Sequence, residues 1–274
     1  MPIGSNVTYP GGKAGAGVYQ TIINQMPPHR VYIEAFLGAG AVMRFKRPAT
    51  SSIAIDADDD VINQWQRENY YNVPNLKLLW GDGLDLLRHY DWQGDELVYC
   101  DPPYLMETRS NGRAYYRFEF TDKQHQQLLE IVKRIPAPVI LSGYYSAMYA
   151  EALSDWCTIT FQSRTRGGRM ATEWLWMNYP EPLELHDYHY LGGTFRERER
   201  IKRKRNRWKA KLLRMPALER HAILSAIQEL RSPASSEMAV AARAATPDMT
   251  LGAPIAEIGD AGSHLARMGV VFEA

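Results

Sequence analysis

The stretch Val31-Tyr32-Ile33-Glu34-Ala35-Phe36-Leu37-Gly38-Ala39-Gly40 decides the fold. Its first six residues are apolar apart from Glu34, which is typical of a buried strand, and the glycines after them are typical of a tight turn into a helix. Glycines at the carboxyl end of a strand let the backbone approach a ligand closely. The stretch therefore predicts a strand followed by a ligand-binding turn, although a turn without a ligand would carry the same residues.

The sequence on both sides of this stretch predicts the rest of a sheet. Short apolar runs alternate with amphipathic stretches, which is the pattern of strands joined by crossover helices. The expected strands are 31–36, 52–56, 76–79, 96–101 and 138–142, and the expected helices are 40–46, 59–71, 84–90 and 122–135. The apolar runs 156–161 and 172–179 flank Gly167-Gly168 and predict a hairpin. We expect an α/β fold with a mostly parallel sheet and a closing hairpin.

The 274 residues are enough for one catalytic domain with additions. We expect a main domain over 1–190, a basic helical extension over 191–231 and a weakly ordered tail over 232–274 that is rich in Ala, Gly, Ser and Pro. The extension holds eleven Lys or Arg against two Glu between positions 194 and 215, whereas the whole chain has a net charge of +1. Such a block is typical of a surface that binds a polyanion, and a solvated helix face explains it equally well.

Several protein classes are excluded by what the sequence lacks. Its apolar runs are too short to cross a membrane, and its N-terminus has no secretory pattern, so we expect a cytoplasmic protein. Cys100 and Cys157 have no spacing typical of a disulfide framework or a zinc site. His186 and His189 lack a nearby third ligand, so we expect no metal.

The stretch Tyr99-Cys100-Asp101-Pro102-Pro103-Tyr104 ends the fourth expected strand. Consecutive prolines make a rigid, extended turn that offers hydrogen-bond acceptors and few donors. The Asp101 carboxylate and the Pro102 carbonyl can accept both hydrogens of one exocyclic amine, while the Tyr104 ring stacks on a planar base. This arrangement localises the nitrogen lone pair for attack on an electrophilic methyl group. A purely structural turn is the alternative.

Two acids follow other expected strands. Asp56 comes about twenty residues after the glycine turn, where an acidic side chain meets ribose hydroxyls in nucleotide-type sites. Asp82 lies between two glycines after the third strand, in a position to meet an adenine amino group. An ordinary surface turn would also carry Asp82.

In their order, these motifs resemble the Dam-like (DPPY-type) DNA adenine-N6 methyltransferases, which depend on S-adenosylmethionine, in a short phage-type variant. The resemblance runs from Tyr9 to about Tyr179, and Tyr9-Pro10-Gly11-Gly12-Lys13 looks like the aromatic-x-Gly-Gly-Lys segment of that family. It implies a Rossmann-like class I methyltransferase sheet, with Asp101, Pro102 and Tyr104 as catalytic residues. The implied cofactor-binding residues are Tyr9, Gly12, Lys13, Glu34, Phe36, Gly38, Gly40, Asp56, Asp82 and Asp101.

The chain departs from Dam itself because no long recognition insertion lies between Gly40 and Asp101. We therefore expect other loops to recognise the target sequence. In such loops Arg and Asn can pair with base edges, and aromatic rings can fill the gap left by an extruded base. Mobile loops that touch only phosphates are the alternative. The candidate DNA-binding residues are Arg109, Asn111, Arg113, Tyr115, Tyr116, Arg164, Arg166, Arg169, Arg203, Arg205, Arg207 and Lys209.

The resemblance implies an enzyme that transfers a methyl group from S-adenosylmethionine to the amino group of an adenine flipped out of double-stranded DNA. We expect it to act as a monomer, encoded by a phage or mobile element in a bacterial host. Two alternatives remain. Tetrapeptides similar to Asp101-Pro102-Pro103-Tyr104 serve ribosomal RNA methyltransferases, so the substrate can be RNA. A non-catalytic DNA-binding protein could retain the fold, although it would have no need for Asp101.

Overall fold

The structure is a computed structural model that describes residues 11–68, 73–109, 112–165 and 168–230. The predicted site residues Tyr9, Asn111 and Arg166 lie outside these ranges, as does the tail predicted over 232–274. The chain divides into two compact units, Met1–Trp208 and Lys209–Ala274, and each is described by itself. The division falls inside the basic extension that the sequence predicts.

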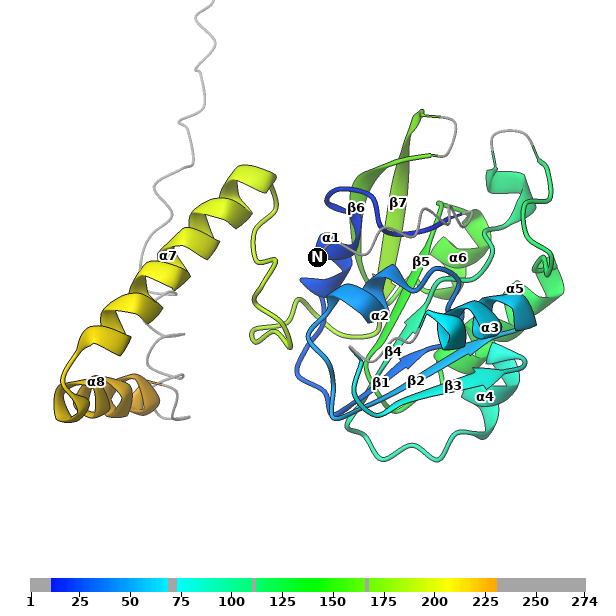
Figure 1. Ribbon diagram of the computed structural model, residues 1–274. Coiled ribbons are helices and arrows are strands. Elements are labelled where there is room, and N and C mark those ends of the chain that lie inside the picture. Colours follow the sequence, from blue (N-terminus) through cyan, green and yellow to red (C-terminus); the bar gives the residue numbers. More distant parts are fainter. Residues whose placement is uncertain (1–10, 69–72, 110–111, 166–167, 231–274) are drawn as a thin grey trace, which may run out of the picture. The chain divides into compact units, whose positions relative to one another are not determined.

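The first unit is built on a seven-stranded sheet with the order β3-β2-β1-β4-β5-β7-β6 (Figure 1). The strands are β1 (Val31–Glu34), β2 (Ser51–Asp56), β3 (Leu76–Trp80), β4 (Glu96–Cys100), β5 (Val139–Gly143), β6 (Cys157–Arg164) and β7 (Met170–Met177). The first five are parallel, and β7 runs antiparallel to both β5 and β6. This order confirms the predicted Rossmann-like methyltransferase fold with a closing hairpin.

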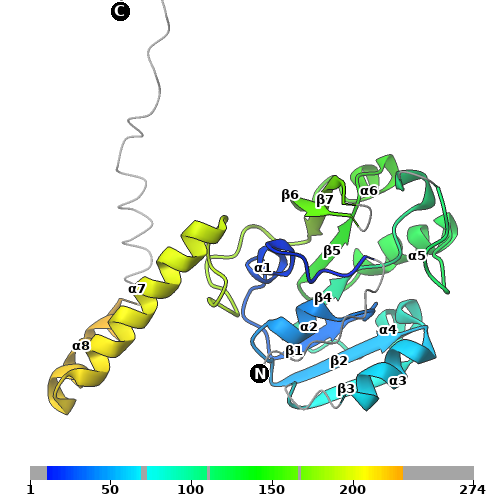
Figure 2. The same cartoon turned by 45° about the horizontal axis from the view of Figure 1, so that its top comes forward.

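Helices cover both faces of the sheet. One face packs against α1 (Val18–Ile23), α2 (Ala41–Phe45) and α3 (Asp59–Arg67), and the other against α4 (Gly83–His89), α5 (Asp122–Val132) and α6 (Ala147–Ala152) (Figure 2). Alternate residues of a strand point to opposite faces, so Tyr32 joins the first core and Ile33 the second. Burial on both faces explains why these strands read as continuous apolar runs.

The element ends differ from the prediction by a few residues, for local reasons. Gly40 has a positive φ of 57° and precedes α2, so the helix begins one residue later than expected. At the start of α5, the capping box between Thr121 and Gln124 is present. The sequence analysis missed α1 and α6, which have only six residues each and therefore show little helical periodicity.

The basic segment forms α7 (Phe195–Arg214), which crosses from the first unit into the second, and α8 (Ala217–Glu229) follows it. Both lie within the basic helical extension that the sequence predicts over 191–231. Along α7 the cationic side chains from Lys202 to Lys209 are exposed. None of the helices in the described ranges combines the length and the apolar character that a membrane crossing needs.

Candidate active site

A cavity of about 280 Å³ opens at the carboxyl ends of the parallel strands. It is centred where β1 and β4 lie side by side, and the crossover connections diverge at that point of the sheet. Open α/β sheets bind ligands at such a switch point. The predicted residues that line the cavity are Gly12, Lys13, Glu34, Phe36, Gly38, Gly40, Asp56, Asp82 and Asp101.

The glycine turn between β1 and α2 is held by side chains of β2 and α3. The backbone N–H of Gly38 donates to Asp56 Oδ2 at 2.7 Å, and Trp65 Nε1 donates to the Gly38 carbonyl at 3.2 Å. At Gly40, a Cβ atom would overlap the Trp65 ring. Glycine is therefore required at this position by both the positive φ and the lack of space.

Asp56 and Asp82 each make backbone contacts as well as lining the cavity. Asp56 Oδ1 accepts a hydrogen bond from the Asp58 N–H at 2.9 Å, and burial raises the pKa of Asp56. Asp82 caps α4, because its Oδ1 accepts from the Leu84 N–H at 2.8 Å. Both predicted acids thus lie at the strand ends where the sequence analysis placed them, in fixed orientations.

Asp101 follows β4 and is bound on both carboxylate oxygens. Ser142 Oγ donates to Oδ1 at 2.7 Å, and the Lys13 ammonium lies 2.8 Å from Oδ2. Burial raises the pKa of Asp101, and Lys13 opposes this shift. Burial alone would lower the pKa of Lys13, but the carboxylates of Asp101 and Glu173 outweigh it and raise that pKa. The sequence analysis did not predict this direct pairing of Lys13 with the tetrapeptide.

Of the other residues of the tetrapeptide, only one is among the described residues that line the cavity. Pro103 lines it, Pro102 is buried, and neither Pro102 nor Tyr104 belongs to the described lining. The Tyr104 hydroxyl donates to Glu173 Oε2 at 2.8 Å, and its ring packs edge to face on Tyr144. Tyr104 is therefore placed beside the cavity and not within it.

Glu34 is a buried acid at the wall of the cavity. Its Oε2 accepts from the Tyr32 hydroxyl at 3.0 Å. Burial raises the pKa of Glu34 to about 8, and burial lowers the pKa of Lys46 to about 7. The Lys46 ammonium favours the charged form of Glu34, and the Glu34 carboxylate favours the charged form of Lys46, because a nearby opposite charge stabilises a charge.

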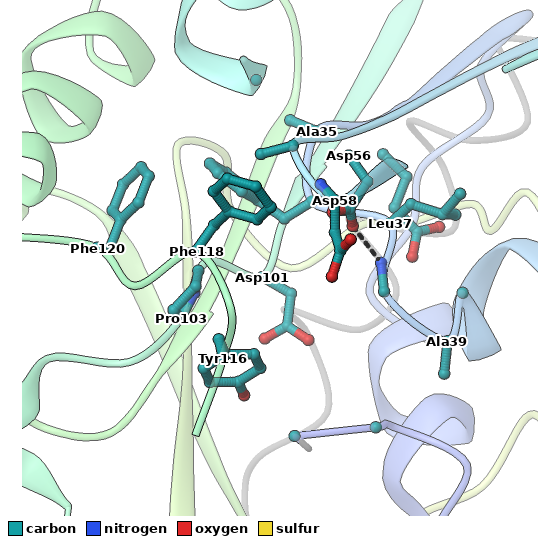
Figure 3. A pocket seen from close by; sticks show the side chains of 18 of the residues that line it. Ala35, Leu37, Ala39, Asp56, Asp58, Asp101, Pro103, Tyr116, Phe118 and Phe120 are labelled. Atoms are coloured by element: carbon teal, nitrogen blue, oxygen red, sulfur yellow. Dashed lines mark hydrogen bonds between the residues drawn. The ribbon is translucent and has the colours of Figure 1, made fainter. Parts of the chain in front are cut away.

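The segment after the tetrapeptide forms another wall of the cavity, which the sequence analysis did not assign to cofactor binding. Tyr116, Phe118, Glu119 and Phe120 line it, and Phe36 and Phe120 pack edge to face. Figure 3 shows Tyr116 and Pro103 beside Asp101, with Asp56 and Asp58 in another part of the pocket. The signal was present in the sequence, because four aromatic residues lie between positions 115 and 120.

Arg109 is placed differently from its prediction as a DNA contact. It is 8% exposed and pairs through both terminal nitrogens with Glu119, at 2.8 and 2.6 Å. Its Nε and Nη2 atoms also donate to the Tyr104 carbonyl. This placement favours a role in holding the loop to the tetrapeptide, because no part of the guanidinium is left to read a base.

Most other predicted DNA-binding residues within the described ranges are on the surface. Arg113 is exposed, Tyr115 is 47% exposed, and Arg164 and Arg169 flank the turn of the β6–β7 hairpin. Arg203, Arg205, Arg207 and Lys209 are exposed on α7. Tyr116, by contrast, lines the cavity, where burial raises its pKa to about 12.

The histidines that were considered as metal ligands make structural contacts. His186 Nε2 lies 3.0 Å from the Arg47 carbonyl, and His189 Nδ1 lies 2.6 Å from Asp187 Oδ1. Within the described part of the chain, Asp58, Asp59 and Asp60 bring three carboxylates together. Arg117 binds all three, at distances of 2.9 to 3.3 Å.

Comparison with known families gives one match, and it includes the tetrapeptide. Residues 68–165 match the family described as D12 class N6 adenine-specific DNA methyltransferase. No curated protein matches the chain.

Three of the similar solved structures illustrate a looser likeness. An rRNA methylase from Streptococcus thermophilus is 12% identical, with a TM-score of 0.40, 62% of this chain covered and 95% of that chain. Magnesium protoporphyrin IX methyltransferase from Synechocystis PCC 6803, with bound SAM, is 13% identical, with a TM-score of 0.39 and coverages of 60% and 76%. A dimethyladenosine transferase from Plasmodium falciparum is 11% identical, with a TM-score of 0.39 and coverages of 59% and 61%. The strand order, and not these overlaps, assigns the fold.

Proposed function

Residues 68–165 match the D12 class N6 adenine-specific DNA methyltransferase family. On this premise we propose that the protein methylates an adenine that is flipped out of double-stranded DNA, and that the adenine binds at the protein's own turn Asp101–Tyr104. The family match confirms the predicted DNA adenine-N6-methyltransferase. The extrusion of the base and the roles of individual residues are our proposal. A base inside a duplex is out of reach of this cavity, so extrusion is needed for the chemistry.

S-adenosylmethionine is the cofactor of this enzyme class, and the cavity suits it. The glycine turn admits close backbone approach, the carboxylates of Asp56 and Asp82 suit ribose and adenine donors, and the rings of Phe36, Phe118 and Phe120 suit an aromatic base. We assign these residues, together with Glu34, to cofactor binding. When bound, S-adenosylmethionine supplies an electrophilic methyl group.

Asp101 and the Pro102 carbonyl orient the adenine amine. Two acceptors that hold both amine hydrogens out of the ring plane localise the nitrogen lone pair, which can then attack the methyl carbon. Asp101 does not need to be a strong base, because the amine becomes acidic only after it is methylated. Tyr104 stacks on the extruded base, and its place beside the cavity agrees with a base that enters next to the cofactor.

One observation carries the proposal: the Asp101 carboxylate lines the same cavity as the glycine turn. The test is expression in a bacterial host that lacks adenine methylation, followed by single-molecule sequencing of the host DNA. We expect N6-methyladenine in the wild-type sample and none with Asp101→Ala. Unmodified DNA from cells that contain folded wild-type protein would contradict the proposal.

The form of the nucleic acid is a separate question, because basic helices suit DNA and RNA alike. We propose double-stranded DNA. Methyl incorporation into a duplex, a single strand and an RNA of the same sequence tests this directly. Incorporation into RNA alone would favour the RNA alternative, and binding without any incorporation would favour a non-catalytic protein. The predicted monomer can be tested by sedimentation of the same sample.

A further inference from the structure

A buried acid on the closing hairpin contacts the tetrapeptide from outside the cavity. Glu173 lies in β7, opposite Phe161 of β6, and is 6% exposed. On the same face of β7, Leu175 and Met177 pack in the first core. A carboxylate in such surroundings costs free energy unless it is fully bonded, so its partners indicate what it does.

Both oxygens of Glu173 have partners. Oε1 accepts from Ser163 Oγ at 2.7 Å, and Oε2 accepts from the Tyr104 hydroxyl at 2.8 Å. The Lys13 ammonium lies 3.6 Å from Oε2. One carboxylate thus joins the end of the tetrapeptide to the lysine that also pairs with Asp101.

The hydrogen bond from Tyr104 restricts its ring at the end farthest from the backbone. The ring leaves a rigid proline turn, packs on Tyr144 with centroids 4.7 Å apart, and has its hydroxyl held by Glu173. A ring held at both ends loses little conformational entropy when a base stacks on it.

The position of Lys13 gives Glu173 a second use. Lys13 Nζ lies at hydrogen-bonding distance from Asp101 Oδ2, where the adenine amine must bind in the proposed reaction. A buried ammonium that lost its partner would be costly. Glu173 is close enough to take over the ammonium, so Lys13 can release Asp101 and remain paired.

We propose that Glu173 is a positioning residue for methyl transfer: it fixes the Tyr104 ring and accepts Lys13 when the adenine amine displaces the lysine from Asp101. The proposal rests on the proposed function. It assigns no contact between Glu173 and either substrate.

The test compares Glu173→Gln with the wild type in methyl transfer to duplex DNA. Gln keeps the volume and can still bond both hydroxyls, but it removes the charge that accepts Lys13. We expect kcat to fall about 10- to 100-fold and the KM for DNA to rise, with the KM for S-adenosylmethionine unchanged within about twofold. The matched control is Thr172→Ala, at an exposed residue next to Glu173 in β7, which we expect to behave as wild type.

A pH profile separates positioning from a structural role. The charge of Glu173 raises the pKa of Asp101 in the free protein, so Glu173→Gln should move the acid limb of kcat/KM, which reports the free enzyme, to lower pH. A variant that is only less well folded would lose activity without moving the limb. A profile and kcat equal to those of the wild type would overturn the proposal.

Tyr104→Phe provides a second route if Glu173→Gln does not fold. It keeps the ring and the pairing of Glu173 with Lys13 but removes the hydroxyl that Glu173 holds. We expect kcat to fall about 10-fold, and the double variant, where it folds, to lose no more than the worse single variant. An unchanged kcat in Tyr104→Phe would overturn the proposal. If the wild type itself transferred no methyl group to DNA, the proposed function would fail instead.

Discussion

Lys13 Nζ lies 2.8 Å from Asp101 Oδ2, so the lysine of the N-terminal segment pairs directly with the acid of the tetrapeptide. The Lys13 side chain is 5% exposed, and at such a site an ion pair strongly affects the protonation of both partners. The charged and titratable groups that interact with Asp101 are Lys13, Glu34, Tyr99, Cys100, Tyr104, Tyr116, Tyr144, Tyr149 and Glu173. Of these, Lys13 alone is cationic.

Replacing Lys13 with Met should therefore shift the pH dependence of methyl transfer. Burial already raises the pKa of Asp101 and Lys13 lowers it, so removal of the ammonium raises that pKa further. We expect the acid limb of kcat/KM, which reports the free enzyme, to move to higher pH by about one unit or more, because the reaction requires the carboxylate form. Lys13→Arg, which keeps the charge, should leave the limb close to that of the wild type. An unmoved limb in Lys13→Met would show that Asp101 does not titrate in turnover.

Replacing Gly40 with Ala should destabilise the fold. The substitution places a Cβ at a φ of 57° and against the Trp65 ring. We expect a loss of roughly 2–4 kcal/mol in the free energy of unfolding, measured by urea denaturation. Gly112→Ala is the control: its φ is 56°, and nothing lies within 4 Å of the new Cβ. Equal losses in the two variants would mean that contact with Trp65 contributes nothing.

Replacing Arg109 with Ala should reduce stability and leave the electrostatics of DNA binding unchanged. The guanidinium is paired with Glu119 and the Tyr104 carbonyl, so we expect a loss of about 2 kcal/mol in the free energy of unfolding. The slope of log Kd against log salt should equal that of the wild type. Arg169→Ala, at an exposed position on the hairpin, should reduce the slope by about 0.9 if the residue contacts one phosphate. A reduced slope in Arg109→Ala would contradict this account and indicate that Arg109 contacts DNA.

Reversing charge on α7 should weaken DNA binding. Arg205 and Arg207 are exposed, and their replacement by Glu should reduce the affinity for DNA. The slope of log Kd against log salt should fall by the contribution of about two phosphate contacts. Methyl transfer at saturating DNA should change little. An unchanged slope would indicate that the cationic face serves solubility and not binding.

The centre of the parallel sheet was predictable because β4 and β5 are buried on both faces. Runs such as 96–101 and 138–142 stand out as continuous apolar sequence, and each of the seven strands lies within a few residues of its prediction. The part of the cavity formed by 34–40, Asp56 and Asp82 was predictable for a related reason, since these residues end strands or closely follow them. Short helices such as α1 and α6 carry too few residues for a periodic signal.

Residues whose role depends on a distant partner could not be predicted. Arg109 looked like a DNA contact because nothing local indicates that Glu119 holds it. Glu173 looked like one polar residue in an apolar strand, and only the tertiary structure brings it to Tyr104 and Lys13. The proximity of Lys13 to Asp101 likewise arises only in the tertiary structure.

The most direct test of the account compares the wild type with Asp101→Ala in two measurements on the same preparations. One is the binding of S-adenosylmethionine by titration calorimetry, and the other is the transfer of labelled methyl groups to duplex DNA. We predict that the variant binds S-adenosylmethionine within a few-fold of the wild type and transfers no label to N6 of adenine. Near-normal transfer by Asp101→Ala would contradict the account.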